Sequence, residues 1–509
     1  MKKLHLTLLI VAAVLVTAIV TIYIILHPEN KHAYSIPKDA VITMSIDPIS
    51  MAWKSGVISE MDNIKTKMLQ LDNDENFQKV AKKLFDDPRY CGIKLIQRIY
   101  YSCVCTNAEQ LDFYHMVALG VNDKEKLLNC IEELGVGIEF KTINNCYVST
   151  NGESTLIFND ERCLLIVGDN SESIALSLID QKKENSIAST KAFEKLDNED
   201  INLLATLTPS LINSAPKYYA SQIEENLPKG LTLSDFENLS LLTTADFQDG
   251  KIVINSKIFT ENEKLKEYIN DIEIDEIDDK YLEYIPEDAL GLFAFSTNGK
   301  KILEDLTSNK EIMDELENIE YFKTIKPLIQ NLSGTVMLSF NDFVSFSAFA
   351  ELEDEKTSKN VIAGIANILE TDMNMPVNNR NECYSIKEDY SEICCNFGVE
   401  DETLFIAANN KLKNYKFKEL DNSIDDADLV DDIDDCYSYL YINLDKALQN
   451  KELIDELDLN ASELTILNSL LKDVKIKYEE VDEFTIEIGF DNDDDNVLEV
   501  IYDFVSDLM

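Results

Sequence analysis

Histidine is almost missing from this sequence of 509 residues. The chain contains four of them: His5, His27, His32 and His115. His5 lies in an apolar N-terminal stretch and the next two follow it directly, so we expect only His115 to belong to the folded part. It lies in DFYHMVALG, a strand-like segment, and we expect a structural role. A Ser-His-Asp triad or a multi-histidine metal site would depend on this single ring.

The short motifs of catalysis and nucleotide binding are also absent: H-E-x-x-H, G-x-S-x-G, G-x-G-x-x-G and G-x-x-x-x-G-K-[ST]. The absence of C-x-x-C argues against a zinc knuckle or a thioredoxin-like redox site. A pair of carboxylates could still catalyse hydrolysis. Among 95 acidic residues, however, such a pair is expected by chance and therefore identifies no site. We therefore predict no enzyme, no cofactor, and no catalytic, cofactor-binding or metal-binding residues.

Positive charge is scarce. The 95 acidic residues face 46 basic ones, which gives a formal net charge of -49. Such a field repels phosphate backbones and anionic headgroups, so we expect no nucleic-acid partner. Arginine, the side chain best suited to bidentate phosphate recognition, occurs only four times. Its positions are Arg89, Arg98, Arg162 and Arg380.

The N-terminus carries one long apolar run. Leu6 to Leu26 contains no charged residue and, at about 1.5 Å per helical residue, can cross a hydrocarbon core of roughly 30 Å. The first cysteine is Cys91, which excludes a lipidated N-terminal cysteine, and no A-x-A-like exit is visible. Lys2 and Lys3 place the N-terminus in the cytoplasm.

We therefore predict an uncleaved signal anchor over residues 1–32, with the transmembrane part at about 6–26. The protein would be a single-pass membrane protein with the bulk of the chain in the periplasm or at the cell surface. The alternative is a secretion signal with an unusual cleavage site.

Ten cysteines in an extracytoplasmic chain would allow up to five disulfides. Their placement favours free buried thiols instead. Cys103 and Cys105 lie two apart and share one face of a strand, while Cys394 and Cys395 are direct neighbours. One or two disulfides are the alternative.

The chain contains an internal repeat. YSIPKDAVITMSID, from Tyr34, returns as YIPEDALGLFAFS, from Tyr284. Three further matches follow in the same order: NNCYVS with NECYSI, CLLIVGDN with TLFIAANN, and LLATLTPSLI with YLYINLDKAL. We predict two homologous halves, a first domain over 33–280 and a second over 281–509.

Short apolar segments between turn residues predict strands, and longer amphipathic segments predict helices. The expected strands are Val41–Ile46, Arg98–Thr106, Phe113–Val121, Glu139–Ser149, Ser154–Asn159, Cys163–Val167, Leu203–Leu207, Leu239–Ala245, Ile252–Phe259, Val474–Glu479 and Phe484–Phe490. The expected helices begin at Pro48, Ser171 and Pro209 or cover parts of Ile58–Phe85, Asp123–Leu134, Glu261–Asn270 and Asn496–Leu508. Short turns between neighbouring strands require antiparallel pairing. The predicted class is α+β: two tandem homologous domains of antiparallel sheet with helices packed on one face.

With the anchor, the Ile36-Pro37-Lys38-Asp39-Ala40 phrase and the following strand, the chain resembles an uncharacterised family of Bacteroidetes cell-envelope proteins, a domain of unknown function. The likeness is clearest over Ile36–Gly56. Members of that family are typically lipid-anchored, and this sequence departs from them because it lacks the lipidation cysteine. The resemblance implies location and fold, and it carries over no site residues.

Two acidic segments and the single tryptophan need an interpretation. DNDDDN at Asp491–Asn496 resembles a calcium loop, but the glycine of the sixth position is missing and the twelfth is Tyr502. We favour a helix-capping role, with a calcium site as the alternative. We interpret Ser423–Cys436 as a solvated linker and Trp53 as a packing residue.

The function that these features favour is a membrane-anchored, extracytoplasmic protein without enzymatic activity. It would act as a binding or scaffolding component of the bacterial cell envelope, with the membrane and an envelope protein or glycan as partners. The alternatives are a carboxylate-dependent envelope hydrolase that acts on glycans, and a calcium-stabilised adhesion module.

Overall fold

The computed structural model describes most of the chain after the apolar N-terminal run. The described residues are 30–57, 75–107, 112–196, 199–214, 223–224, 227–228, 230–272, 275–287, 289–308, 316, 318, 321–341, 345–380, 383–387, 394–408, 420, 422–424, 429–449, 454 and 467–508. The predicted anchor, at about 6–26, lies outside them. Within these residues no helix is both long enough and apolar enough to span a bilayer.

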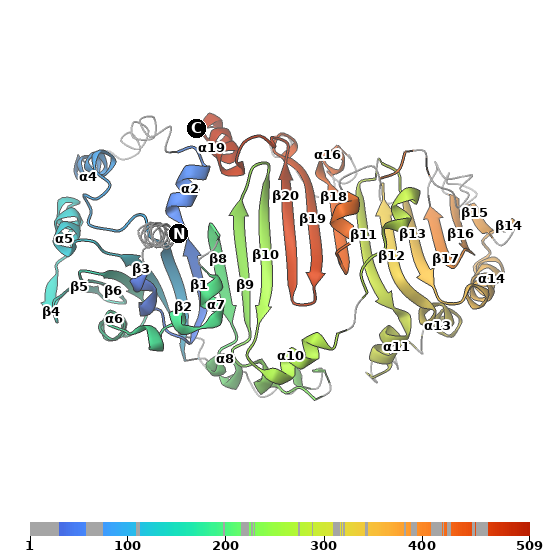
Figure 1. Cartoon of the computed structure of the whole chain (residues 1–509), viewed down its shortest axis with the longest axis horizontal. Helices are drawn as coiled ribbons and strands as arrows, with labels where there is room; N and C mark the ends of the chain where they lie inside the picture. Colours follow the sequence, from blue (N-terminus) through green and yellow to red (C-terminus); the bar gives the residue numbers. More distant parts are fainter. Residues whose placement is uncertain are drawn as a thin grey trace, which may run out of the picture. The chain divides into compact units, whose positions relative to one another are not determined.

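The described chain is a mixed α+β protein with twenty strands, and the observed pairings are antiparallel (Figure 1). This confirms the predicted class. The chain divides into two compact units. The first unit contains the residues up to Asp246, Phe259–Asn262 and the residues from Leu498 on, and the second contains Phe247–Ile258 and Glu263–Val497.

In the first unit the strands pair in the order β4-β5-β6-β7-β3-β2-β1-β8-β9. Their bounds are β1 Ala40–Ile46, β2 Ile99–Asn107, β3 Asp112–Gly120, β4 Lys141–Ile143, β5 Cys146–Asn151, β6 Ser154–Phe158, β7 Arg162–Val167, β8 Ile201–Thr206 and β9 Ser240–Phe247. The helices are η1 Lys31–Ser35, α2 Pro48–Lys54, α4 Glu75–Asp86, α5 Lys124–Glu133, α6 Ser171–Leu178, η2 Lys183–Asn185, η3 Ile187–Ser189, α7 Lys191–Lys195, α8 Pro209–Ser214 and η4 Leu233–Phe236. The last helix, α19, covers Val497–Leu508.

In the second unit the order is β14-β15-β16-β17-β13-β12-β11-β18-β19-β20-β10. The bounds are β10 Lys251–Phe259, β11 Gly291–Asn298, β12 Leu332–Phe340, β13 Phe346–Leu352, β14 Val377–Arg380, β15 Cys383–Lys387, β16 Cys394–Glu400, β17 Thr403–Ala408, β18 Ser438–Asn443, β19 Leu471–Glu480 and β20 Glu483–Phe490. The helices are α10 Glu263–Asn270, η5 Asp279–Tyr284, α11 Gly299–Ser308, α13 Phe322–Gln330, α14 Glu355–Thr371, α15 Leu429–Ile433 and α16 Leu444–Ala447.

Local interactions explain where α2 and α5 begin and where α5 ends. The Asp47 carboxylate accepts hydrogen bonds from the backbone amides of Ile49 and Ser50, which starts α2. Asp123 caps α5 in the same way. After α5 the chain passes through Gly135 at a φ of 67°, a conformation that costs glycine little.

Two predictions of local structure are wrong. Glu139–Ser149 is a hairpin of β4 and β5, because Asn144 and Asn145 adopt left-handed backbone angles, φ 48° and 64°, and turn the chain. Ser423–Cys436 is also more than a solvated linker. Ile424, Leu429, Ile433 and Cys436 of this segment are buried in the core of the second unit, and the partly buried Val430 packs against that core.

The described cysteines confirm the prediction of free thiols. Nine cysteines are free: Cys91, Cys103, Cys105, Cys130, Cys146, Cys163, Cys383, Cys395 and Cys436. Seven of them are buried, and Cys383 and Cys395 are partly exposed. They act as small apolar residues of the two cores.

Candidate functional site

The chain enters the first unit through a firmly packed segment. His32 is fully buried in η1, where its Nε2 atom lies 2.7 Å from the carbonyl oxygen of Arg98. Burial, with smaller contributions from the nearby Lys94 and Arg162 charges, lowers the pKa of His32 to about 4. The expectation that only His115 belongs to the folded part is therefore wrong. His115 itself lies on β3 as predicted, exposed, with Nδ1 2.7 Å from the Tyr101 hydroxyl.

Strand β1, which lies between β2 and β8, has large apolar side chains on its outward side. In β1 the buried positions are Ala40, Thr43 and Ser45, whereas Ile42 is 36% exposed and Met44 is partly exposed. A sheet with one solvated face usually has the opposite pattern, with apolar residues inward. Here the inward hydroxyl of Ser45 belongs to a buried network, in which it accepts from the Arg98 guanidinium at 3.3 Å.

Neighbouring strands extend this outward apolar face. In the register, Met44 lies opposite Tyr101 on β2 and Leu203 on β8. The exposed large residues of the face are Ile42, Leu165, Val167, Leu203 and Leu241. An exposed patch of this kind, on strands whose other side is the core, is typical of a binding surface. We call these five residues the outer face.

An apolar hollow of about 340 Å³ lies at the end of the same side of the sheet. Ile99 and Leu119 belong to its lining, and each lies two residues from an outward position of β2 or β3. Pro48 and Ile49 at the start of α2 form one wall of the hollow. The loop Ile93–Arg98 forms the other, and Leu95 is 42% and Ile96 66% exposed.

Trp53 lies on the same side of α2 as Ile49, one turn further along. It is 68% exposed, so the prediction of a packing residue is wrong. The core of the first unit is built without it, from residues such as Tyr100, Met116 and Leu164.

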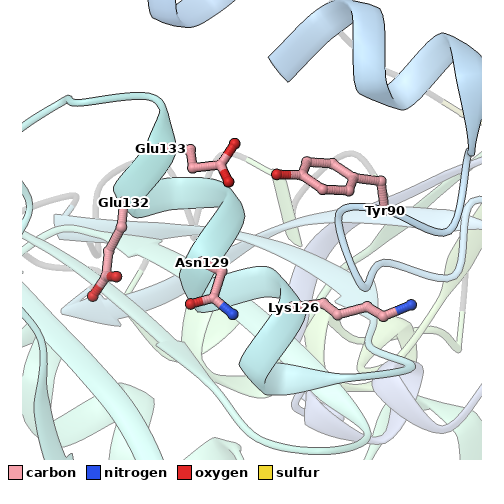
Figure 2. Close-up of a pocket in the computed structure, with 5 residues that line it drawn as sticks. All are labelled: Tyr90, Lys126, Asn129, Glu132 and Glu133. Atoms are coloured by element: carbon pink, nitrogen blue, oxygen red, sulfur yellow. The ribbon is translucent and has the colours of Figure 1, made fainter. Parts of the chain in front are cut away.

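A second cavity, of about 440 Å³, lies beside α5 (Figure 2). It is lined by Tyr90, Lys126, Asn129, Glu132 and Glu133. Figure 2 shows Glu133 directed toward Tyr90 and Glu132 directed away from both. The two carboxylates therefore do not face each other across the cavity. Glu133 receives a hydrogen bond from Lys83 at 2.5 Å, which holds its pKa below the usual range.

A third cavity, of about 210 Å³, lies over Gly489 in the second unit. Asp473 and Lys251 are opposite Gly489 on its two neighbouring strands, so the missing side chain leaves room between them. Asp473 and Glu487 both line this cavity. Burial raises the pKa of Asp473, whereas the pKa of Glu487 is lowered because Lys251 and Lys477 outweigh the effect of burial.

Beside this cavity lies a chain of alternating charges. Asp432 of α15 accepts hydrogen bonds from Lys475 at 2.6 Å and Lys477 at 2.5 Å. Lys477 also pairs with Glu487 at 3.2 Å, and Glu487 with Lys251 at 2.9 Å. Burial would raise the pKa of Asp432, but the two lysines outweigh it and hold that pKa below its usual range.

The acidic segment Asp491–Asn496 forms a turn before α19. The Asn492 side chain accepts hydrogen bonds from the backbone amides of Asp494 and Asp495, both at 3.2 Å. In the part of the chain that the structure describes, no group of three or more His, Cys, Asp or Glu residues is arranged to hold a metal ion.

The fold and these surfaces define an α+β protein with an outward apolar face in its first unit. Residues 33–498 match the model of a family described as a domain of unknown function, DUF4836, and the chain belongs to that family. This agrees with the expected resemblance to a family of unknown function.

No curated protein matches the chain. Two solved structures of TP0453 are similar to it at 10% identity. Crystal form IV gives a TM-score of 0.25 and covers 44% of this chain and 79% of the other. Crystal form I gives 0.24 and covers 48% and 85%. A likeness at this level supports no functional argument.

Proposed function

We propose that the protein is a membrane-anchored, extracytoplasmic binding or scaffolding component of the cell envelope without enzymatic activity. The outer face carries this proposal, because five large apolar side chains are exposed on strands whose opposite side forms the core. The anchor rests on the uncharged run from Leu6 to Leu26. The partner would be an envelope protein or glycan.

Anchoring and topology can be tested with the full chain in cells. The protein should stay in the membrane pellet after alkaline carbonate extraction, and protease added outside the cytoplasmic membrane should degrade its bulk. Extraction into the carbonate supernatant would contradict the anchor, and protection from the protease would contradict the topology.

Binding can be tested by replacing Leu203 with a photoreactive amino acid in the full chain. Irradiation of whole cells should yield one defined adduct, because Leu203 is 39% exposed on the outer face. The same substitution at Val136, an exposed residue between α5 and β4, is the matched control. Equal adducts from both positions, or none from Leu203, would contradict a specific binding face.

One observation favours the alternative of a carboxylate-dependent hydrolase acting on glycans. Asp473 and Glu487 line one cavity and their pKa values move in opposite directions, as in an acid and base pair. Envelope glycan fragments released by the wild type but not by Asp473→Asn or Glu487→Gln would establish the hydrolase. No release by the wild type would remove it.

We retain the calcium-stabilised adhesion module as a further alternative. It predicts that calcium raises the melting temperature of the protein and that a chelator lowers it. A melting temperature that neither calcium nor the chelator changes would exclude this alternative.

We further propose that the chain consists of two tandem homologous halves. The support is that IPxDA opens both, with Ile36 and Ile285 fully buried after a 3-10 helix. Each isoleucine carbonyl also accepts a hydrogen bond at 2.9 Å, from the amides of Ile187 and Ile424. The two strand orders given above correspond position by position from β4 to β9 and from β14 to β19.

A further inference from the structure

The chain has little room between the predicted anchor and the first unit. Leu26 and His32 are six positions apart, and an extended chain covers at most about 3.6 Å per residue. His32 is fully buried and lies 2.7 Å from the carbonyl oxygen of Arg98, so the loop that ends at Arg98 is fixed beside it. If the run to Leu26 spans the membrane, this loop lies within roughly 20 Å of the hydrocarbon boundary.

The surface at this point has the composition of a membrane interface. Leu95 is 42% exposed, Ile96 66% and Trp53 68%. Leu95 lines the apolar hollow described above, Ile96 follows it in the same loop, and Trp53 lies one turn along α2 from Ile49, which forms the opposite wall. Tryptophan is enriched at the headgroup level, where its ring contacts acyl chains and its N–H contacts water. Lys94 lies next to the two apolar loop residues, and among the described residues no ion pair engages its ammonium group. Its positive charge suits a lipid phosphate.

We propose that Trp53, Leu95 and Ile96 insert into the outer surface of the bilayer that holds the anchor, with Lys94 at the level of the phosphates. The occupant of this surface is lipid, because the tether brings it to the membrane and the exposed side chains are those that interfaces favour. The contact would fix the orientation of the first unit on the bilayer. The inference rests on the proposed anchor and extends it.

The single tryptophan makes this contact measurable in the full chain, since Trp53 is its only indole. The wild type is reconstituted in phosphatidylcholine vesicles with or without brominated acyl chains. Bromine should remove roughly half of the Trp53 emission, since the ring would lie at the acyl boundary. Acrylamide in the water phase should quench it less than in the chain unfolded by urea.

Two variants locate the contact. Leu95→Asp with Ile96→Asp should abolish the bromine quenching, because carboxylates oppose insertion, and both positions are exposed, so the fold is kept. Leu203→Asp, an equally exposed change on the outer face, should keep it. Loss of quenching in Leu203→Asp alone would overturn the assignment to this loop.

The outcomes of this experiment distinguish a failure of the lipid contact from a failure of the predicted membrane anchor. Vesicle flotation with full access of acrylamide to Trp53 would overturn the lipid contact and leave the anchor standing. Failure to float would contradict the anchor itself. Protection of Trp53 only after envelope proteins are added would also overturn the proposal, since the occupant would then be a protein.

Discussion

At the scale of single residues, two buried groups of the described chain show how burial is tolerated: Asp432 is paired with lysines and His32 is kept neutral. His32 is the clearest case of a neutral group. Its Nδ1 atom has no hydrogen-bond partner in the described part of the chain and faces Gly120. A proton on this ring would be buried among positive charges.

Replacing His32 by Gln should make the stability of the protein less dependent on pH between about 6.5 and 4. The pKa of His32 is about 4 when folded and near 6.5 when unfolded, so its contribution is present above pH 6.5 and lost as the pH falls toward 4. This loss is on the order of 3 kcal/mol. Urea unfolding across this range measures it, and His115→Gln, which removes an exposed ring, is the control. Wild-type pH dependence in His32→Gln would contradict the burial.

Asp432→Ala should lower the free energy of unfolding by roughly 3 kcal/mol, because Lys477, which is 8% exposed, would lose a partner while remaining buried. Glu161→Gln breaks the Lys31–Glu161 pair, whose side chains are nearly half exposed. Its cost should stay within about 1 kcal/mol. Equal losses for both variants, measured by denaturant unfolding, would show that the Asp432 network is not buried in solution.

At the scale of elements, the sequence predicted strands and helices well where the signal is local. The Asp47-Pro48 cap and the stop at Gly135 are such signals. It missed α15, because seven aspartates between Ser423 and Cys436 hide the helical spacing of Leu429 and Ile433. The alternation of apolar and polar residues in β1 could not show which side faces the core either. The buried Ser45 is satisfied by Leu196 and Asn202, which are distant in the sequence, so its burial cannot be foreseen locally.

Gly291→Ala should destabilise the pairing of β11 with β12. Phe340 lies opposite Gly291 in the register, and a Cβ atom there would be 2.2 Å from the Phe340 ring. Because the ring would have to leave its place, we expect a cost of roughly 1 to 3 kcal/mol.

The matched control for this change is Gly364→Ala in α14. Its nearest neighbour would be Thr324 at 3.7 Å, so the added methyl meets no clash. Alanine is a better helix former than glycine, and we expect a stabilisation of about 0.5 to 1 kcal/mol. Thermal melting measures both, and a destabilised Gly364→Ala variant would contradict the open space at this position.

At the scale of the whole molecule, both units contain free thiols, and the nine cysteines whose side chains the structure describes are all unpaired. The native protein should react slowly with a thiol reagent, because seven of the nine described free cysteines are buried. Unfolding in guanidinium without a reductant should release at least nine reactive thiols per chain. A smaller number would indicate disulfides and contradict the structure.

The candidate binding surfaces were the part of the protein that the sequence alone predicted least well. Leu95 and Ile96 are neighbours, Trp53 is distant from them in the sequence, and nothing in the sequence marks the three as exposed. The structure shows that the three side chains are exposed. It also shows that the loop of Leu95 and Ile96 lies close to His32, where the chain enters the first unit. The predicted absence of catalytic residues is a matter for the activity tests described above.

The pairing of β10 with β20 has a consequence for the order in which the protein is made. Lys251 pairs with Gly489, so β10 leaves the ribosome more than two hundred residues before its partner. Contacts that distant are entropically slow to form, and an unpaired strand edge is an aggregation risk while it waits. The second unit cannot be completed until β20 has been synthesised. A chain interrupted before Glu483 would therefore leave the edge of β10 that pairs with β20 without a partner. Such an unpaired edge is a feature by which chaperones or proteases could recognise an incomplete chain.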